Sequence, residues 1–428
     1  MKTNVTELNR GQNFPCAKDP VFLEQRIDRY YRERVNKTWN GGHILRGRIP
    51  GKDALHLSSN DYLSLAKHTK ILHAAAESLL SDGGGLLMSG IFLHGASPLL
   101  NFEQKLAHFM RAPAGVLCQS GWCANTGLIQ SIADEQTLVY MDMLAHMSLW
   151  EGVRSAGASA VKFHHNDPEH LERQLLKHGP GVIVVDSVFS TNGSVCPLTD
   201  IVELGTVHGC VLVVDESHAL GTHGSKGEGL VAALGLEDRV HFRTASLAKA
   251  FAGRAGFIAC SERFGEYFKF ESNPAIFSST LLPHEAVGLD TTLEVIRSEG
   301  WRRSQLHDNA DYLRRELEEL GYNLNNSESQ IIALESGTEQ QTIVLRNALE
   351  SRGIFGSIFC APATPKNRAL MRLSINCELS QSDLLRIVKV CRDIRDEVDL
   401  ANWPSTRRKP SVSPTSKFLN EAEKAEVA

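Results

Sequence analysis

The sequence contains no long apolar run and no apolar core near its amino terminus, so we expect neither a membrane span nor a secretory signal. A net charge of only −5 gives no electrostatic reason to expect nucleic acid or an anionic membrane as a partner. The nine cysteines are odd in number and form no CxxC pair, which argues against a disulfide framework and predicts reduced, mostly buried thiols. These features, with no internal repeat, predict a globular protein of the cytoplasm.

What the sequence does contain is an alternation of strands and helices. Between residues 110 and 260, short apolar runs separated by helix-length segments predict strands at 115–118, 136–141, 160–163, 181–185, 210–214 and 256–260. Near-continuous apolar strands alternating with helices indicate an α/β fold whose mostly parallel sheet is covered on both faces. Ligands of such sheets bind beyond the carboxyl ends of the strands.

The pattern changes after residue 285. A long helical stretch, Glu285–Leu320, precedes an apolar run at 330–334, a helix near 339–352 and an alternating strand at 371–376. The alternation predicts a sheet with one solvated face, and so a smaller α+β domain. We therefore expect an N-terminal helical segment (1–60), a large domain (61–285), a small C-terminal domain (286–402) and a disordered tail (403–428) rich in Pro, Ser and basic residues.

One lysine stands out by its surroundings. Lys249 lies among small and apolar residues, where an ammonium group is costly to bury. Burial lowers the pKa of a lysine and makes the amine a nucleophile that can join an aldehyde. Asp215 ends an earlier apolar strand, and His218 follows it. Because a carboxylate can keep a pyridine nitrogen protonated while a lysine carries the aldehyde, these residues predict a pyridoxal phosphate enzyme.

Other interpretations of the polar residues are weaker. Metal ligands occur in two groups, one made of His164, His165, Asp167 and His170 and the other of Asp215, His218 and His223. Adjacent histidines on a strand point apart, and neither group supplies a convincing ligand set, so we expect no metal. The glycine run at 83–85 lacks the Gly-Lys-Ser/Thr of a phosphate loop and is interpreted as a turn.

Several stretches in one order resemble the fold-type I α-oxoamine synthases, which include 8-amino-7-oxononanoate synthase, 2-amino-3-ketobutyrate CoA ligase and 5-aminolevulinate synthase. The matching stretches are 59–65, 120–125, 142–148, 165–167, 188–190, 215–224, 246–249, 277–280 and 372–376. The resemblance covers residues 22–398 and implies a fold-type I pyridoxal-phosphate-dependent transferase. Further stretches, at 119–122, 145–152, 185–191 and 274–283, are similar to those of autoinducer synthases that build the α-aminoketone precursor of an α-hydroxyketone signal.

The resemblance also implies roles for single residues. For catalysis, it implies a lysine joined to the cofactor, an acid at the pyridine nitrogen, a histidine on the ring and a histidine at the phenolic oxygen: Lys249, Asp215, His146 and His218. The remaining cofactor-binding residues, mostly around the phosphate, would be Ser120, Gly121, Trp122, Ser190, Ser246 and Thr280, the last of these from a neighbouring subunit. Arg372 would clamp the carboxylate of an amino acid, with Asn60 and Tyr62 beside the substrate.

The implied reaction joins an acyl-CoA to a small amino acid, with loss of CO2, to give an α-aminoketone. Leu86 stands where the family usually has an arginine, and the segment 86–93 is apolar. This departure favours a longer, medium-chain acyl group over a small or charged one. Alternatives are an enzyme like 8-amino-7-oxononanoate synthase or 2-amino-3-ketobutyrate CoA ligase, or a fold-type I aminotransferase; a noncatalytic binding protein is a further one. The family implies a homodimer with shared active sites.

Overall fold

The computed structural model describes residues 17–36 and 42–403. Residues up to Ile49 form one unit and residues from Pro50 onward form another. The first unit contains α1 (Val21–Tyr30), continued by a π-helical turn, η1 (Tyr31–Val35), and no residue of either helix is buried. The expected tail lies outside the described residues except for Trp403, which is buried against Tyr322. The domain boundaries expected from the sequence stay predictions.

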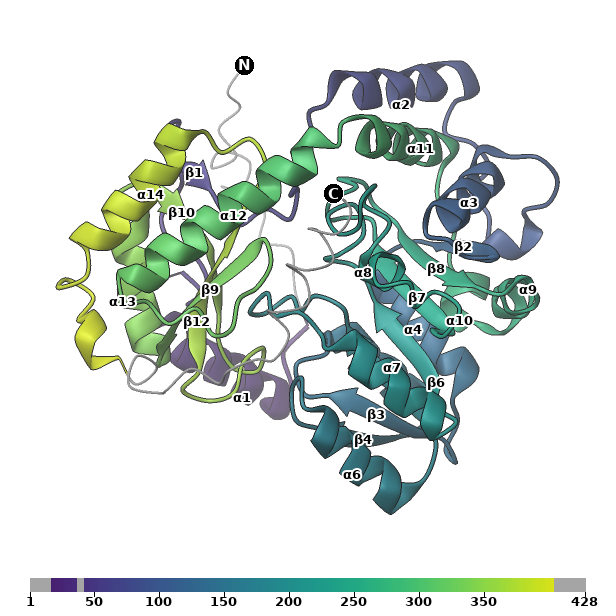
Figure 1. Ribbon diagram of the computed structural model, residues 1–428, viewed down its shortest axis with the longest axis horizontal. Helices are drawn as coiled ribbons and strands as arrows, with labels where there is room; N and C mark the ends of the chain where they lie inside the picture. Colours follow the sequence, from purple (N-terminus) through teal and green to yellow (C-terminus); the bar gives the residue numbers. More distant parts are fainter. Residues whose placement is uncertain (1–16, 37–41, 404–428) are drawn as a thin grey trace, which may run out of the picture. The chain divides into compact units, whose positions relative to one another are not determined.

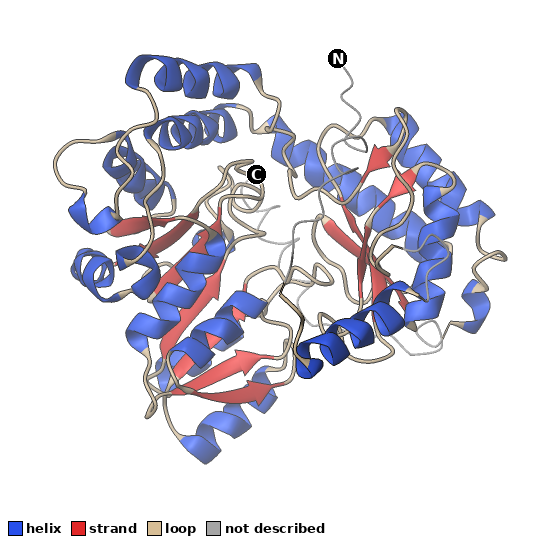
Figure 2. Ribbon diagram, turned by 180° about the vertical axis from the view of Figure 1, so that it is seen from behind, coloured by secondary structure: helices blue, strands red, loops and turns tan. Residues whose placement is uncertain are grey.

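The second unit contains a seven-stranded sheet within the described chain, as the sequence predicted (Figure 2). The strand order is β2-β8-β7-β6-β5-β3-β4, and only β8 runs antiparallel to its neighbours. The strands are β2 (Ala114–Cys118), β3 (Leu138–Asp142), β4 (Ser159–Phe163), β5 (Val182–Asp186), β6 (Val211–Asp215), β7 (Phe242–Ser246) and β8 (Gly256–Cys260).

One of these strands was not expected from the sequence. The residues of β7 are Phe242-Arg-Thr-Ala-Ser246, which is too polar to match a continuous apolar run. Arg243 is nevertheless 2% exposed, because its guanidinium donates a hydrogen bond to the main-chain oxygen of Met110. A buried strand can therefore carry a charged side chain when a main-chain carbonyl accepts a hydrogen bond from it.

Helices cover the sheet on both faces, and alternate residues of a strand pack against the helices of opposite faces. In β5, Ile183 and Val185 join the apolar cluster under α6 (Pro168–His178), α7 (Leu198–Val207) and α8 (Leu230–Ala233). Val182 and Val184 join the opposite cluster, under α4 (Gly121–Ile132), α5 (Met147–Ser155) and α9 (Glu262–Glu271). Both faces of the strand are thus removed from water, as parallel sheets require.

Further helices pack beside this sheet. They are α2 (Thr69–Asp82), α3 (Pro98–Phe109), α10 (Asn273–Ile276) and α11 (Pro283–Ser298), with a 3-10 turn at η2 (Gly90–Phe92). Helix α11 packs along α2 and α3 (Figure 1). The long helical stretch expected at 285–320 is in fact two helices, because the chain turns at Glu299 and Gly300 before α12 (Trp301–Glu319) begins.

A smaller antiparallel sheet follows, in the order β11-β12-β9, formed by β9 (Ile331–Gly337), β11 (Ser357–Phe359) and β12 (Ala369–Ser374). It packs with α12, α13 (Glu339–Glu350) and α14 (Gln381–Asp393), which surround it in Figure 1. A separate parallel pair joins β1 (Leu55–His56) to β10 (Ile354–Phe355), and a 3-10 turn, η3 (Leu400–Asn402), follows α14.

The prediction of one solvated face for this sheet is wrong. All six residues of β12 are buried. Met371 and Leu373 join the apolar core, whereas the Arg372 side chain, on the other face, donates to the main-chain oxygen of Ser190. Ser374 is buried on the same face as Arg372, and its main-chain N–H donates to the main-chain oxygen of Leu57. The alternation therefore marks a polar face covered by other parts of the protein.

The cysteines in the described ranges are free, and all of them except Cys123 are buried, as the sequence predicted. Among the helices that the structure describes, none combines the length and apolar character needed to cross a membrane.

Candidate active site

A cavity of about 350 Å³, counting its open mouth, lies where four strands of the large sheet end. Beta strands β3, β5, β6 and β7 run parallel, so their carboxyl ends meet at this edge. The lining residues are Gly121, Trp122, Asn125, His146, Ser148, Asp186, Asp215, Ser217, His218, Ser246 and Lys249. The cavity thus gathers seven of the candidate residues named from the sequence, including the four proposed for catalysis.

Asp215 is the last residue of β6 and is 3% exposed. Its two carboxylate oxygens accept hydrogen bonds, one from Asn125 Nδ2 at 2.7 Å and the other from the main-chain N–H of Ser217 at 2.8 Å. Both partners are donors, which is what an ionised carboxylate needs when it is removed from water. The carboxylate is thereby held in one orientation at the cavity wall.

Lys249 lies in the turn after β7 and is partly buried. The turn is closed by main-chain hydrogen bonds, from Ala252 N–H to the oxygen of Lys249 and from Gly253 N–H to the oxygen of Leu247. Burial is the main cause that lowers the pKa of the Lys249 amine, and the charge of Arg372 lowers it further, although Asp215 opposes both. A lowered pKa makes the neutral amine more available as a nucleophile or base.

His146 is the N-cap residue of α5, and its side chain is fixed by a neighbour on the same helix. Its Nδ1 atom lies 2.7 Å from Ser148 Oγ, which also receives a hydrogen bond from Asn125 Nδ2. The histidine is therefore linked to Asp215 through two neutral side chains. Desolvation lowers the pKa of His146, and the charge of Lys249 acts in the same direction, while Asp215 opposes them.

Four lining residues were quoted only inside sequence motifs or not at all: Asn125, Ser148, Asp186 and Ser217. Asp186 ends β5 in register with Asp215 and accepts a hydrogen bond from the main-chain N–H of His146. Burial, and secondarily the charge of Asp215, raises the pKa of Asp186 well above its usual value. The sequence held a signal for this residue, because it too is an acid at the end of an apolar strand.

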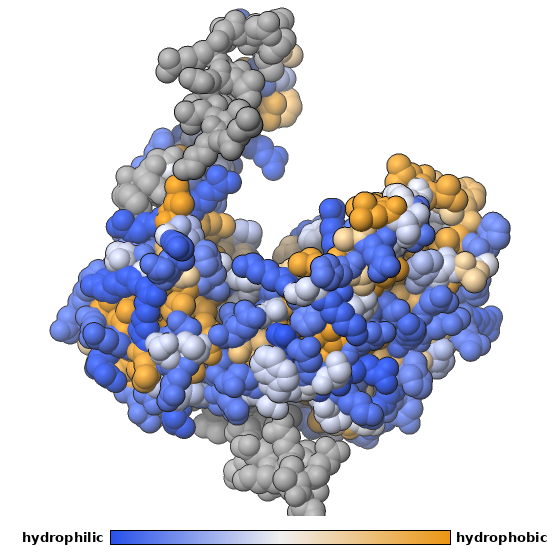
Figure 3. Space-filling model, turned by 90° about the horizontal axis from the view of Figure 1, so that it is seen from above, coloured by the Kyte–Doolittle hydropathy of each residue, from blue (hydrophilic) through white to orange (hydrophobic). Residues whose placement is uncertain are grey.

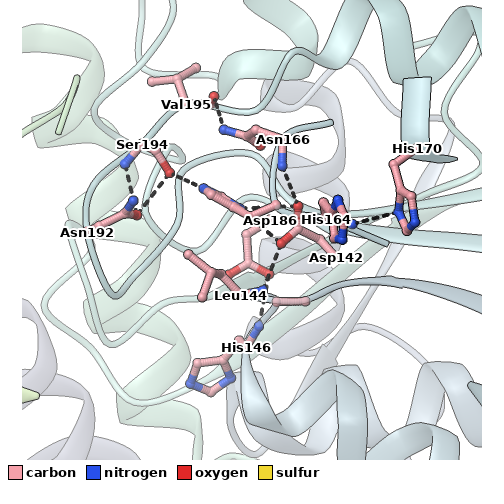
Figure 4. A network of polar contacts seen from close by, with 12 residues as sticks. Asp142, Leu144, His146, His164, Asn166, His170, Asp186, Asn192, Ser194 and Val195 are labelled. Carbon is pink, nitrogen blue, oxygen red and sulfur yellow. Dashed lines mark hydrogen bonds and ion pairs between the residues drawn. The ribbon is translucent and has the colours of Figure 1, made fainter. Parts of the chain in front are cut away.

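The network behind His146 explains the histidine-rich segment that follows β4 (Figure 4). The Asp142 carboxylate accepts hydrogen bonds from the main-chain N–H groups of Leu144 and Asn166 and lies 3.0 Å from His165 Nδ1. The other ring nitrogen of His165 lies 2.8 Å from Ser194 Oγ. His165 therefore ties the loop after β3 to the loop after β5.

The neighbouring histidine belongs to a different contact. The His164 ring stacks on His170 with centroids 3.9 Å apart, on the outer side of the network in Figure 4. Across residues 17–36 and 42–403, no group of three or more His, Cys, Asp or Glu side chains has the arrangement of a metal site.

The start of α4 forms one end of the cavity. Ser120 is the N-cap, and its Oγ accepts a hydrogen bond from the N–H of Cys123. A Cβ atom on Gly121 would come within 2.5 Å of Ser246 Cβ, so only glycine lets the helix start approach the end of β7 this closely. The first N–H groups of a helix have no partner within the helix and favour an anion.

The substrate side of the site is a chain of hydrogen bonds. His218 Nδ1 lies 2.7 Å from the Tyr62 hydroxyl, which lies 3.2 Å from Asn60 Oδ1. Arg372 donates from Nη2 to Asn60 Oδ1 at 2.9 Å and from Nη1 to the main-chain oxygen of Ser190 at 2.7 Å. The structure thus brings together five candidates from four separate parts of the sequence.

Arg372 is 6% exposed and held on a third side by the ring of Phe359, whose centroid lies 4.8 Å from the guanidinium carbon. Its Nε atom is buried and has no hydrogen-bond partner in the structure. A buried, unpartnered N–H on a preorganised guanidinium is a ready donor to a carboxylate.

Thr280 lies apart from the cavity and from the hydrogen bonds described above. Its main-chain N–H bonds to the oxygen of Met88, and it does not line the cavity. The expectation that it reaches the phosphate of a second subunit stays a prediction.

These residues fit pyridoxal phosphate in their chemistry. An ionised acid is held at one wall, a lysine with a lowered pKa lies at the cavity, and the start of α4 offers N–H groups beside Ser246. An aldehyde, a pyridine nitrogen and a phosphate are the groups that such a set binds.

Comparison with known proteins agrees with this geometry. The family model described as aminotransferase class I and II matches residues 52–390, and the chain belongs to that family. The CAI-1 autoinducer synthase of Vibrio campbellii is 45% identical over 89% of this chain and 97% of its own length. An 8-amino-7-oxononanoate synthase of Bacillus velezensis is 30% identical over 90% of this chain and its full length.

Solved structures show the same fold. A structure of SPT with a PLP internal aldimine superposes with a TM-score of 0.78, at 25% identity, covering 86% of this chain and 92% of that one. A serine palmitoyltransferase variant from S. paucimobilis gives a TM-score of 0.79 at 24% identity, covering 89% of this chain and 98% of that one. The resemblance seen in the sequence and the fold class predicted from it are confirmed.

Proposed function

We propose that this protein is a pyridoxal-phosphate-dependent acyltransferase that condenses an acyl-CoA with a small amino acid, with release of CoA and CO2, to give an α-aminoketone, the precursor of an α-hydroxyketone autoinducer. The observation that carries the proposal is the 45% identity with an autoinducer synthase over nearly the whole of that relative. The site supports it, because an amine, an acid and an arginine are held around one cavity.

The bound cofactor supplies an electron sink that makes the Cα proton of the amino acid removable. Arg372 binds the carboxylate of the amino acid with its free guanidinium N–H groups and so orients the Cα–H bond. Lys249, with its lowered pKa, accepts the proton at Nζ. Asp215 would pair with the pyridine nitrogen, and its two donors hold the carboxylate in one orientation.

The remaining residues hold the cofactor. The main-chain N–H groups of Gly121 and Trp122, at the N-terminus of α4, bind the phosphate together with the Ser246 hydroxyl, and Ser120 caps that helix start. The His146 ring would lie against the pyridine ring, and His218 would face the phenolic oxygen. These assignments follow the family resemblance and are supported by the shared cavity.

Exposed hydrophobic side chains support a medium-length acyl group. Leu86, Leu87, Phe92 and Phe277 are each at least 60% exposed, although large apolar side chains are usually covered. Hydrophobic patches are visible on a mostly hydrophilic surface in Figure 3. We propose that these side chains cover the aliphatic chain of the thioester. We also propose that the enzyme is a homodimer and that it is cytoplasmic.

The direct test incubates the purified, cofactor-loaded protein with acyl-CoAs of graded length and a panel of small amino acids. Release of one CoA per α-aminoketone, identified by mass, supports the proposal. Keto-acid formation without CoA release identifies an aminotransferase, and preference for a short or charged acyl group identifies one of the two related synthases.

The homodimer has its own test. If Thr280 serves the neighbouring site, mixing inactive Lys249→Ala chains with impaired Thr280→Ala chains restores activity, because each mixed dimer contains one intact site. Activity that stays at the level of the separate variants contradicts shared sites.

A further inference from the structure

Tyr62 sits between the two halves of the site, and its ring lies beside that of His218, with the ring centroids 6.0 Å apart. Its side chain is completely buried, with 0% exposure, and its hydroxyl has two neighbours, His218 Nδ1 at 2.7 Å and Asn60 Oδ1 at 3.2 Å. A buried hydroxyl has a single proton to donate, so it must choose between these acceptors.

The distances decide where that proton lies. Hydrogen bonds between two oxygens usually span about 2.5–3.0 Å, so 3.2 Å to Asn60 is long, whereas 2.7 Å to His218 is short. Asn60 Oδ1 already accepts a bond from the positively charged Arg372 at 2.9 Å. The Tyr62 hydroxyl therefore donates to His218 Nδ1.

A ring nitrogen that accepts a hydrogen bond carries no proton, so the proton of a neutral His218 lies on Nε2. Burial lowers the pKa of His218 well below its usual value. The charges of Lys249, Arg372 and His146 act in the same direction. The ring is therefore neutral, and its tautomer is set by a single neighbour.

We propose that Tyr62 is a positioning residue that fixes the tautomer of His218, so that His218 presents an Nε2–H donor to the phenolic oxygen of the cofactor. This assigns Tyr62 a task other than the substrate contact implied by the family resemblance. Asn60 contributes by accepting the hydrogen bond from Arg372 on the substrate side, which leaves the Tyr62 proton for His218. The inference rests on the proposed place of His218 at the phenolic oxygen.

The test is a pH titration of the absorbance of the bound cofactor in Tyr62→Phe, which removes one oxygen and keeps the ring. A donor at the phenolic oxygen competes with the proton that this oxygen shares with the Lys249 nitrogen. Without a fixed donor that proton is held more tightly, so the titration midpoint rises by about 0.4–1 pH unit.

Two further variants sharpen the result. Tyr322→Phe removes an equivalent hydroxyl from a tyrosine that is 4% exposed and donates to the oxygen of Cys391, away from the cavity, and leaves the midpoint unchanged. In a His218→Gln background, Tyr62→Phe produces no further shift. A midpoint that Tyr62→Phe leaves at its wild-type value, or moves equally with and without His218, overturns the inference. Failure to form an α-aminoketone would instead count against the proposed reaction, since the titration needs no substrate.

Discussion

The two walls of the site are built in different ways. The cofactor wall, at the ends of β3, β5, β6 and β7, gathers acids, a lysine and a helix start from residues 120–249. The substrate wall gathers Asn60, Tyr62, Ser190 and Arg372, and the hydrogen bond from Arg372 to Asn60 joins residues 312 positions apart. The first wall follows from the order of strands, whereas the second depends on the small sheet packing against the large one.

The electrostatics differ as well. On the cofactor wall Asp215 has two hydrogen-bond donors, whereas burial and the charge of Asp215 raise the pKa of Asp186, so a second negative charge beside Asp215 is disfavoured. On the substrate wall Arg372 is received by neutral oxygens, which orient the guanidinium without cancelling its charge. The cofactor wall is therefore suited to hold a cation, and the substrate wall keeps the positive charge of Arg372 available for an anion.

The largest expected effect is on the cofactor wall. Lys249→Ala removes both the attachment point and the base, so turnover falls by a factor of about 10²–10⁴ or more. Borohydride reduction followed by peptide mapping places the pyridoxyl tag on residue 249 of the wild type and on no residue of the variant. Lys389→Ala, an exposed lysine on α14, is the matched control with wild-type turnover. A tag elsewhere in the wild type contradicts the whole assignment.

A pair of acid substitutions tests the difference between the two strand-end carboxyls. Asp215→Asn removes a charge held by two donors, and we expect kcat to fall by about 10–150-fold, since one charged hydrogen bond contributes about 1.5–3 kcal/mol. Because the pKa of Asp186 is raised, its uncharged form is favoured and a neutral amide is the closer substitute, so we expect Asp186→Asn to change kcat by less than about tenfold. Steady-state kinetics of the two variants checks this, and equal losses would show that Asp186 carries charge.

On the substrate wall, Arg372→Lys keeps the charge but loses the fork that matches a carboxylate. We expect the KM for the amino acid to rise about 10–100-fold while the KM for the acyl-CoA changes little. The control is Arg368→Lys, at an arginine just before β12 that pairs with Glu335. A rise in the KM for the acyl-CoA alone would show that Arg372 binds the acyl-CoA and not the amino acid.

The smallest expected effect concerns stability and lies where α12 contacts the loop after β6. His307, on α12, contacts the main-chain oxygen of Thr222 in the loop after β6, and the adjacent His223 is packed edge-on against it. Burial lowers the pKa of His223 to about 3. Because the unfolded chain binds a proton more readily, the protein loses stability as pH falls below about 6.5, by up to about 2 kcal/mol at pH 5.

Thermal unfolding measured at pH 7.5 and pH 5 checks this contribution. His223→Gln loses less in Tm between the two pH values than the wild type, because glutamine does not titrate. His178→Gln, at an exposed histidine ending α6, behaves like the wild type. An identical pH dependence in all three proteins means that His223 titrates normally.

Sequence alone was sufficient for most of the large sheet and for part of the cofactor wall. Apolar runs located six of the seven strands, and the parallel order brings the carboxyl ends of β3 and β6 to one edge, so His146 and Asp215 had to lie near that edge. Ser246 and Lys249 follow β7, which the apolar pattern missed, so their residue types and the family resemblance, and not a predicted strand end, indicated that they belong to the site. Such inferences succeed because burial on both faces leaves a strong, local pattern of apolar residues. The polar strand β7 was missed for the same reason, since its buried arginine depends on a carbonyl from another element.

Only the tertiary structure determined the substrate wall. The alternation in β12 shows that two of its residues are polar, but not that both are buried, nor that the Arg372 side chain meets Ser190 in place of water. Likewise, no local pattern tells that the Tyr62 hydroxyl meets His218, 156 positions later. Hydrogen bonds between distant segments depend on distances of a few tenths of an ångström, and these are set only when the two sheets pack together.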